Sequence, residues 1–326
     1  MATTSRFQKK PEWLKIKAPS GKSYQDIAKM LREKKLATVC QEALCPNINE
    51  CWNGGTATIM LLGDTCTRGC RFCAVNSGNP KGVLDEMEPF NTAETIKTMN
   101  LNYIVLTTVD RDDLQDGGAA HIAKTIRYAK ETCPQTMIEC LVGDFRGDHM
   151  GVKTVVDAKP EVFAHNIETV ERLTPTVRDR KAGYDQSLKV LKAAKSFSDQ
   201  IYTKSSIMLG LGETLDELKQ AFADLRTHQV DFLTLGQYLQ PSKKHLAVER
   251  FVHPDEFKEL QALAMTYGFI YVASGPLVRS SYKAAEFFIE SHIKSKQAHG
   301  KNLNKNPNPV DIKAEQYKSL PVIQQV

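Results

Sequence analysis

The feature that most restricts the fold of this chain is an alternation of short apolar runs with longer segments of helical periodicity. Seven apolar runs of strand length follow residue 56, at 58–62, 103–107, 137–142, 162–165, 206–211, 232–235 and 271–273. Between them, apolar residues recur three and four apart, as in amphipathic helices, at 92–99, 121–130, 184–194, 215–225 and 254–267. Strands that alternate with helices predict an α/β fold with a parallel sheet and right-handed crossovers.

About six such units indicate a partial TIM-like (β/α) barrel, with an open doubly wound sheet as the alternative that periodicity does not separate. The barrel is expected over residues 56–282. Residues 1–55 form an N-terminal extension with one clear helical pattern, at 24–35, and no clear strand. Residues 283–326 form a C-terminal extension. Its part from about Lys294 is rich in Lys, Asn, Pro and Gln and is expected to be an irregular segment that wraps the barrel, with partial disorder as the alternative.

Composition argues against several classes of protein. No apolar run approaches the roughly 18 residues that a membrane span needs, and the basic N-terminus lacks the apolar stretch of a secretory signal. We therefore expect a cytoplasmic protein that does not bind a membrane. The net charge is +5, and much of it lies near the two ends. No basic stripe is interleaved with aromatic residues, so nucleic acid is not an expected partner.

The chain has eight cysteines, and in a cytosolic protein clustered cysteines indicate metal or redox chemistry rather than disulfides. Cys66, Cys70 and Cys73 form C-x3-C-x2-C directly after the first expected strand, at the end of a barrel where active sites lie. Three thiolates can hold three irons of a cubane cluster and leave the fourth iron open to a small molecule such as S-adenosylmethionine. A structural zinc site, the alternative, usually has four protein ligands.

This motif resembles the signature of the radical S-adenosylmethionine superfamily, including the aromatic residue Phe72 before the last cysteine. The resemblance implies a [4Fe-4S] cluster that cleaves S-adenosylmethionine to a radical, which abstracts hydrogen from unactivated carbon. The protein would position and shield that chemistry.

A second triplet, Cys40, Cys45 and Cys51, forms C-x4-C-x5-C upstream of the barrel, where a second cubane or a small zinc site are the alternatives. Together with Arg279-Ser280-Ser281-Tyr282 it resembles the pattern of lipoyl synthases. Taken alone, the two serines would be read as a helix cap or turn. The resemblance implies a second [4Fe-4S] cluster that is ligated by Ser281, with Ser280 as the alternate, and consumed as the sulfur source. It also implies the reaction, which inserts two sulfur atoms at C6 and C8 of a protein-bound octanoyl chain.

Further residues are candidates for binding the cofactor. Gly117 and Gly118 follow the second expected strand and would let backbone approach S-adenosylmethionine closely, unless they only begin a helix. Asn166, after the fourth strand, is in a region that lines the cofactor pocket in the resembling family. Arg178 is suited to bind a carboxylate, with a surface ion pair as the alternative.

The resemblance also implies partners: octanoylated lipoyl-carrier domains, an electron donor such as flavodoxin or ferredoxin, and an iron–sulfur carrier that rebuilds the spent cluster. A biotin-synthase-like or methylthiotransferase-like enzyme is an alternative within the superfamily. A non-catalytic iron–sulfur carrier or zinc protein is an alternative outside it, and the barrel rhythm argues against that reading because a carrier needs no barrel.

Overall fold

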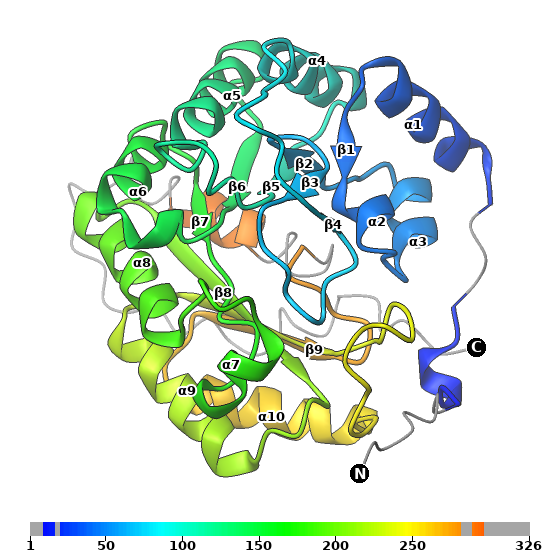
Figure 1. The fold of residues 1–326 in the computed structure, drawn as a ribbon, viewed down its shortest axis with the longest axis vertical. Coiled ribbons are helices and arrows are strands. Elements are labelled where there is room, and N and C mark those ends of the chain that lie inside the picture. The colour runs from blue at the N-terminus through cyan, green and yellow to red at the C-terminus, as the bar shows by residue number, and fades with distance from the viewer. Residues whose placement is uncertain (1–8, 17–19, 282–288, 297–326) are drawn as a thin grey trace.

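The computed structural model describes residues 9–16, 20–281 and 289–296. The main sheet has eight strands in the order β1-β2-β5-β6-β7-β8-β9-β10 (Figure 1). These are β1 (Ala37–Thr38), β2 (Ile59–Leu61), β5 (Tyr103–Thr108), β6 (Met137–Leu141), β7 (Val162–Ala164), β8 (Tyr202–Leu209), β9 (Phe232–Gln237) and β10 (Tyr271–Gly275). Short strands β3 (Thr65–Cys66) and β4 (Asn76–Ser77) form a separate parallel pair.

Every neighbouring pair from β2 to β10 is parallel, and a helix follows each of the first six of these strands. The helices are α4 (Glu88–Met99), α5 (Ala119–Thr132), α6 (His149–Val156), α8 (Tyr184–Phe197), α9 (Leu215–Thr227) and α10 (Pro254–Thr266). They cover the outside of the curved sheet in Figure 1. The α/β fold with about six strand–helix units is confirmed.

The N-terminal extension is fastened to one end of the sheet. It contains η1 (Glu12–Leu14), α1 (Lys22–Glu33), α2 (Val39–Glu42) and α3 (Ile48–Asn53). The expected absence of a clear strand there needs a correction, because β1 pairs antiparallel with β2 through two residue pairs, Ala37↔Met60 and Thr38↔Ile59. Two residues are too few to give a periodic sequence signal.

Strand β8 begins at Tyr202, four residues before the predicted run. The sequence pattern missed this start because Lys204 interrupts the apolar residues, although its side chain is buried in the structure. Its ammonium Nζ lies 2.8 Å from both carboxylate oxygens of Glu139 on β6, and Tyr103 donates a hydrogen bond of 2.7 Å to the same carboxylate. Side chains alternate between the faces of a strand, so Glu139 and Lys204 point to the same face as Leu141 and Ser206. The pair is therefore inside the curved sheet.

Replacing Lys204 by methionine is expected to lower the free energy of unfolding by about 3–5 kcal/mol, because Glu139 would be left buried without its cation. Urea denaturation measures this change. The control is Lys189→Met, which removes an exposed pair with Asp185 on α8 and should cost less than about 1 kcal/mol. Adding Glu139→Leu to Lys204→Met should recover stability. Equal losses of unfolding free energy in Lys204→Met and Lys189→Met would contradict this account.

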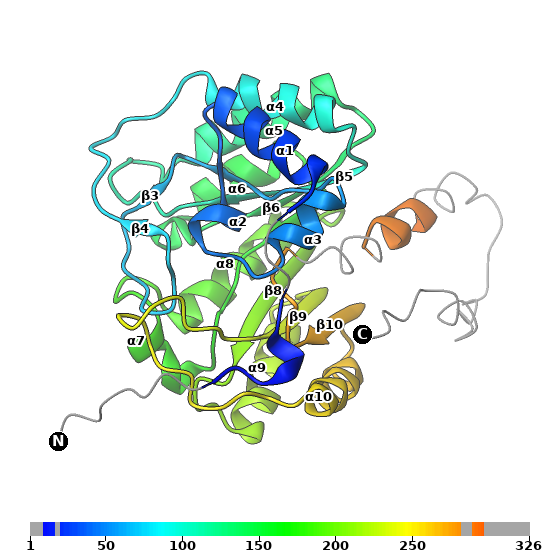
Figure 2. The ribbon, with the colours of Figure 1, turned by 90° about the vertical axis from the view of Figure 1, so that its right-hand side faces the viewer.

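The end of the sheet where the parallel strands begin is covered by residues 289–296, which lie to the right of the sheet in Figure 2. Ile289 and Ile293 are buried in one cluster with Val105, Val162 and Phe232. The rest of the expected C-terminal extension, residues 283–288 and 297–326, is outside the described residues.

Candidate active site

A pocket of about 790 Å³ opens inside the curved sheet. Thr107, Leu141 and Ser206 reach it from the strands, and the N-terminal extension supplies another wall. Both groups of thiols reach this pocket: it is lined by Cys40, Cys45, Cys66, Cys70 and Cys73. Cys51 is not part of the lining, but it packs in the same apolar cluster as Cys40 and Cys45.

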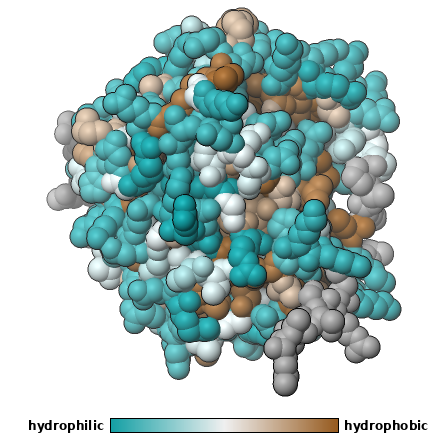
Figure 3. All heavy atoms as spheres, viewed as in Figure 1, coloured by the Kyte–Doolittle hydropathy of each residue, from teal (hydrophilic) through white to brown (hydrophobic). Residues whose placement is uncertain are grey.

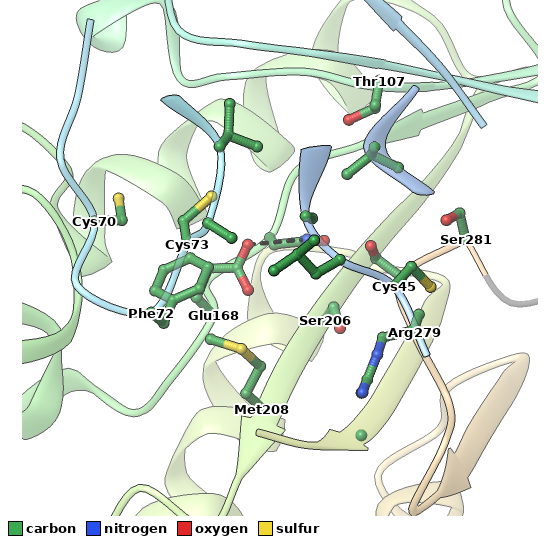
Figure 4. A pocket seen from close by; sticks show the side chains of 18 of the residues that line it. Cys45, Cys70, Phe72, Cys73, Thr107, Glu168, Ser206, Met208, Arg279 and Ser281 are labelled. Carbon is green, nitrogen blue, oxygen red and sulfur yellow. Dashed lines mark hydrogen bonds between the residues drawn. The ribbon is translucent and has the colours of Figure 1, made fainter. Parts of the chain in front are cut away.

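The two motifs occupy opposite sides of the pocket (Figure 4). Cys70 and Cys73, with Phe72, lie on one side, and Cys45 lies on the other beside Arg279 and Ser281. Ser280 and Ser281 both line the pocket, and Tyr282 is outside the described residues. Residues that are more than 200 positions apart in sequence therefore meet at one site.

Main-chain N–H groups point at the sulfur atoms of the first motif. Cys66 Sγ accepts from the amides of Arg68 at 3.5 Å and Asp110 at 3.4 Å, and Cys70 Sγ accepts from Asp179 at 3.3 Å. Hydrogen bonds to sulfur favour the ionised thiolate that iron requires. The loop thus supplies hydrogen bonds that would stabilise thiolates at Cys66 and Cys70.

Arg68, between the first two of these cysteines, is a site residue that sequence reasoning missed. Its buried guanidinium donates to Asp144 at 2.8 Å and to Asp112 at 3.1 Å, and it lies 3.6 Å from Asp110. The pair holds the pKa of Asp144 at about 2 against the opposing effect of burial. The run of acidic residues from Asp110 to Asp116 is a sequence signal for Asp110 and Asp112 but not for Asp144.

Burial dominates the pKa values of the thiols. It raises the pKa of Cys40 and of Cys73 to about 11 and that of Cys70 to about 12. Thiols with such pKa values keep their protons at neutral pH until a metal displaces them. These environments therefore fit buried metal ligands better than exposed nucleophiles.

Asn166 and Arg178 both line the pocket, as expected for cofactor contacts. The Asn166 amide donates to Glu168 at 3.1 Å, while its Oδ1 is buried with no hydrogen-bond partner among the described residues. An unsatisfied buried acceptor is costly unless a bound molecule supplies a donor. S-adenosylmethionine carries such donors in its amino and hydroxyl groups.

Arg178 is buried, which argues against a surface ion pair as its role. Its Nη1 donates to Ser187 Oγ at 2.9 Å, and the Ser187 hydroxyl lies 2.8 Å from Nε2 of His165. Burial, with Arg178 nearby, lowers the pKa of His165 to about 4, so this ring is neutral and its Nδ1 donates to the Val142 carbonyl. The guanidinium is thus fixed at the pocket wall as a preorganised cation.

Gly117 and Gly118 do not line this pocket. They directly precede α5 with φ values of +63° and +87°, and a Cβ on Gly118 would lie 2.6 Å from Leu62. Their conformation and packing account for glycine here, which is the alternative reading given for them above.

Comparison with known proteins agrees with these motifs. The family model of the radical SAM superfamily matches residues 60–225, and that of the N-terminal domain of lipoyl synthase matches residues 2–45. The chain is 58% identical over 290 residues to the lipoyl synthase of Myxococcus xanthus, which covers 89% of this chain and 96% of that protein. The chain belongs to the lipoyl synthase family. It is therefore a radical S-adenosylmethionine enzyme of a sulfur-inserting kind, with at least one [4Fe-4S] cluster.

The family also includes proteins of organelles. The mitochondrial lipoyl synthase of Aedes aegypti is 55% identical over 311 residues, which covers 94% of this chain and 79% of that protein. No helix among the described residues is long and apolar enough to cross a membrane. The X-ray structure of the FeFe-hydrogenase maturase HydG from Carboxydothermus hydrogenoformans superposes with a TM-score of 0.52 at 12% identity, covering 82% of this chain and 78% of that one, which shows a shared fold.

Proposed function

We propose that this chain inserts two sulfur atoms, at C6 and C8, into an octanoyl chain carried on a lysine of a lipoyl-carrier domain. The observation that carries the proposal is that two separate thiol motifs face one pocket from opposite sides. One motif suits the generation of a radical and the other suits the supply of sulfur, and a substrate carbon between them is within reach of both. The membership of the lipoyl synthase family supports the same reaction.

In this proposal Cys66, Cys70 and Cys73 hold the first [4Fe-4S] cluster, and Phe72, Asn166 and Arg178 contact S-adenosylmethionine. When bound, this cluster supplies the electron that cleaves the cofactor. Arg178 is suited to the methionine carboxylate because its guanidinium is already oriented by Ser187. Gly117 and Gly118 would act indirectly, through the packing of α5 against Leu62.

The second [4Fe-4S] cluster would be held by Cys40, Cys45, Cys51 and the hydroxyl oxygen of Ser281. A serine oxygen is a hard donor and a poor match for the soft iron–sulfur centre, so this corner is the weakest of the four. A weak corner suits a cluster that surrenders sulfide. Ser280 also lines the pocket and is the alternate ligand.

The apolar side chains at the pocket suit an eight-carbon chain. Ile16, Val39 and Leu44 line it, and Ile16 and Leu44 are 49% and 66% exposed. In Figure 3, hydrophobic residues are visible in the central part of this face and are framed by hydrophilic ones. An uncharged chain can enter such a pocket while its carrier domain stays outside.

The proposed partners follow from this reaction. They are octanoylated carrier domains, an electron donor such as flavodoxin or ferredoxin, and an iron–sulfur carrier for rebuilding the second cluster. A cytoplasmic location remains our proposal.

With both clusters reconstituted, S-adenosylmethionine and a chemical reductant, the protein is expected to convert an octanoylated carrier domain into its lipoylated form. Free octanoate should react poorly, because it lacks the carrier contacts that place C6 and C8 between the motifs. Mass spectrometry of the carrier measures the product, and a reaction without S-adenosylmethionine is the control. Equal turnover of free octanoate would contradict the carrier part of the proposal, and no sulfur insertion at all would contradict the function.

A further inference from the structure

Asn47 stands immediately before α3, at the position where an asparagine side chain normally accepts a hydrogen bond from the first turn of the helix. Here the side chain makes no such bond. Its amide Nδ2 instead donates to the carbonyl oxygen of Leu277 at 2.7 Å, across 230 positions of sequence. Asn47 is 4% exposed, so a buried side chain makes this long-range bond in place of a helix cap.

The segment that Asn47 reaches is the one that follows β10 and leads to Ser281. From its other side it is held by β9. The Arg279 guanidinium donates to the Gln237 carbonyl at 2.9 Å, and a Cβ built on Gly236 would lie 2.1 Å from the Val278 carbonyl oxygen. Gly236 therefore lets the segment lie directly against the strand. Residues 277–279 are thus held between β9 and Asn47.

Asn47 also contacts the second thiol motif directly. Its main-chain carbonyl accepts a hydrogen bond of 2.9 Å from the main-chain N–H of Cys51. Figure 4 shows Cys45 next to Arg279 and Ser281. The motif follows β1 and the segment of Leu277 follows β10, which are the two end strands of the sheet. The Asn47 side chain therefore joins the chain beyond one end of the sheet to the chain beyond the other.

We propose that Asn47 is a positioning residue that holds residues 277–281 against the Cys40–Cys45–Cys51 motif and so places the Ser281 hydroxyl as the fourth ligand of the second cluster. This inference rests on the proposed function, in which that cluster supplies sulfur. Asn47 acts through the Leu277 carbonyl and does not itself bind iron. Without its bond, the three thiolates would remain while the oxygen ligand lost its fixed place.

The test compares Asn47→Asp with Asn53→Asp in the reconstituted full chain. Aspartate keeps the size of asparagine but cannot donate. Asn53 is the matched control, because its amide also donates to main-chain carbonyls, of Ser20 at 2.6 Å and Asn49 at 2.8 Å, but does not touch residues 277–281. Four quantities are measured: iron per chain, the Mössbauer spectrum, the rate of iron loss to a chelator, and the yields of 5′-deoxyadenosine and lipoyl product.

We expect the control to match the parent protein, with about eight irons per chain from two cubanes. Asn47→Asp should show an altered iron site in the Mössbauer spectrum of the second cluster and faster loss of about half of its iron to the chelator. Lipoyl product should fall, while 5′-deoxyadenosine still forms because the first motif is untouched. Parent-like spectra and chelation rates for Asn47→Asp would overturn the inference.

A second variant keeps the test decisive if Asn47→Asp does not fold. Gly236→Ala pushes on the Val278 carbonyl from the β9 side and displaces the same segment, so it should give the same change in the Mössbauer spectrum and in chelation. A parent-like result for a folded Gly236→Ala would also count against the inference. If the parent protein itself binds only one cluster, the proposed function fails instead, and the two failures are distinguished.

Discussion

Joint replacement of Cys66, Cys70 and Cys73 by alanine is expected to abolish reductive cleavage of S-adenosylmethionine and to lower iron from about eight to about four per chain. The physical reason is that these thiolates are the only protein ligands that we assign to the first cluster, so without them the cofactor has no electron source. The measurements are 5′-deoxyadenosine by chromatography, and iron and sulfide by chemical analysis.

Cys133→Ala is the matched control, because this half-buried cysteine does not line the pocket and should leave both quantities unchanged. Surviving cleavage in the triple variant would show that the radical chemistry has another centre. A fall of iron to zero would show that the two motifs do not hold separate clusters.

Joint replacement of Cys40, Cys45 and Cys51 by alanine is expected to have the opposite pattern: cleavage of S-adenosylmethionine continues, and lipoyl product disappears. The second motif lies on the opposite wall of the pocket from the first, so its loss removes the sulfur source and leaves the radical source in place. Chromatography of 5′-deoxyadenosine measures the cleavage, and mass spectrometry of the carrier domain measures the lipoyl product. Lipoyl product from this variant would remove the sulfur-donor hypothesis.

Single variants at Ser281, the proposed oxygen ligand of the second cluster, refine this result. Ser281→Cys should still assemble the second cluster, because a thiolate is a softer and stronger donor, yet it should release sulfide less readily and yield less product. Ser281→Ala should also lose product by leaving that corner open. If both variants form product fully, Ser281 is not the ligand, and Ser280→Ala becomes the variant to measure.

The strands of the barrel were predictable because most of them are buried on both faces and read as continuous apolar runs. The prediction was wrong at the start of β8, where Lys204 is buried by pairing with Glu139. It also missed α6, which contains Gly151 in its first turn and spans only eight residues. A charge whose partner is 65 positions away cannot be recognised as buried from its own neighbours in sequence.

The thiol motifs were predictable because each gathers three cysteines within a short stretch of chain, in a spacing that resembles a known family pattern. The residues that place them were not predictable. Arg68 meets Asp112 and Asp144, and Asn47 meets Leu277, only after the barrel has formed. Gly117 and Gly118 are the opposite case: the sequence singled them out as cofactor contacts, and the structure accounts for them by the packing beside α5. Spacing in the sequence indicates candidate ligands, whereas tertiary contacts show which residues support them.

The ladder between β1 and β2 has a consequence for how such enzymes can diversify. The chain leaves the sheet at Thr38 and returns at Ile59, and these two residues are paired with each other. All three thiols of the second motif lie on this excursion, which starts and ends at one place on the edge of the sheet. The first motif, by contrast, is built into the connection between β2 and α4. A barrel of this kind can replace the segment between these two strands by a different one without changing its strand order. The same radical-generating loop can then act on many different substrates.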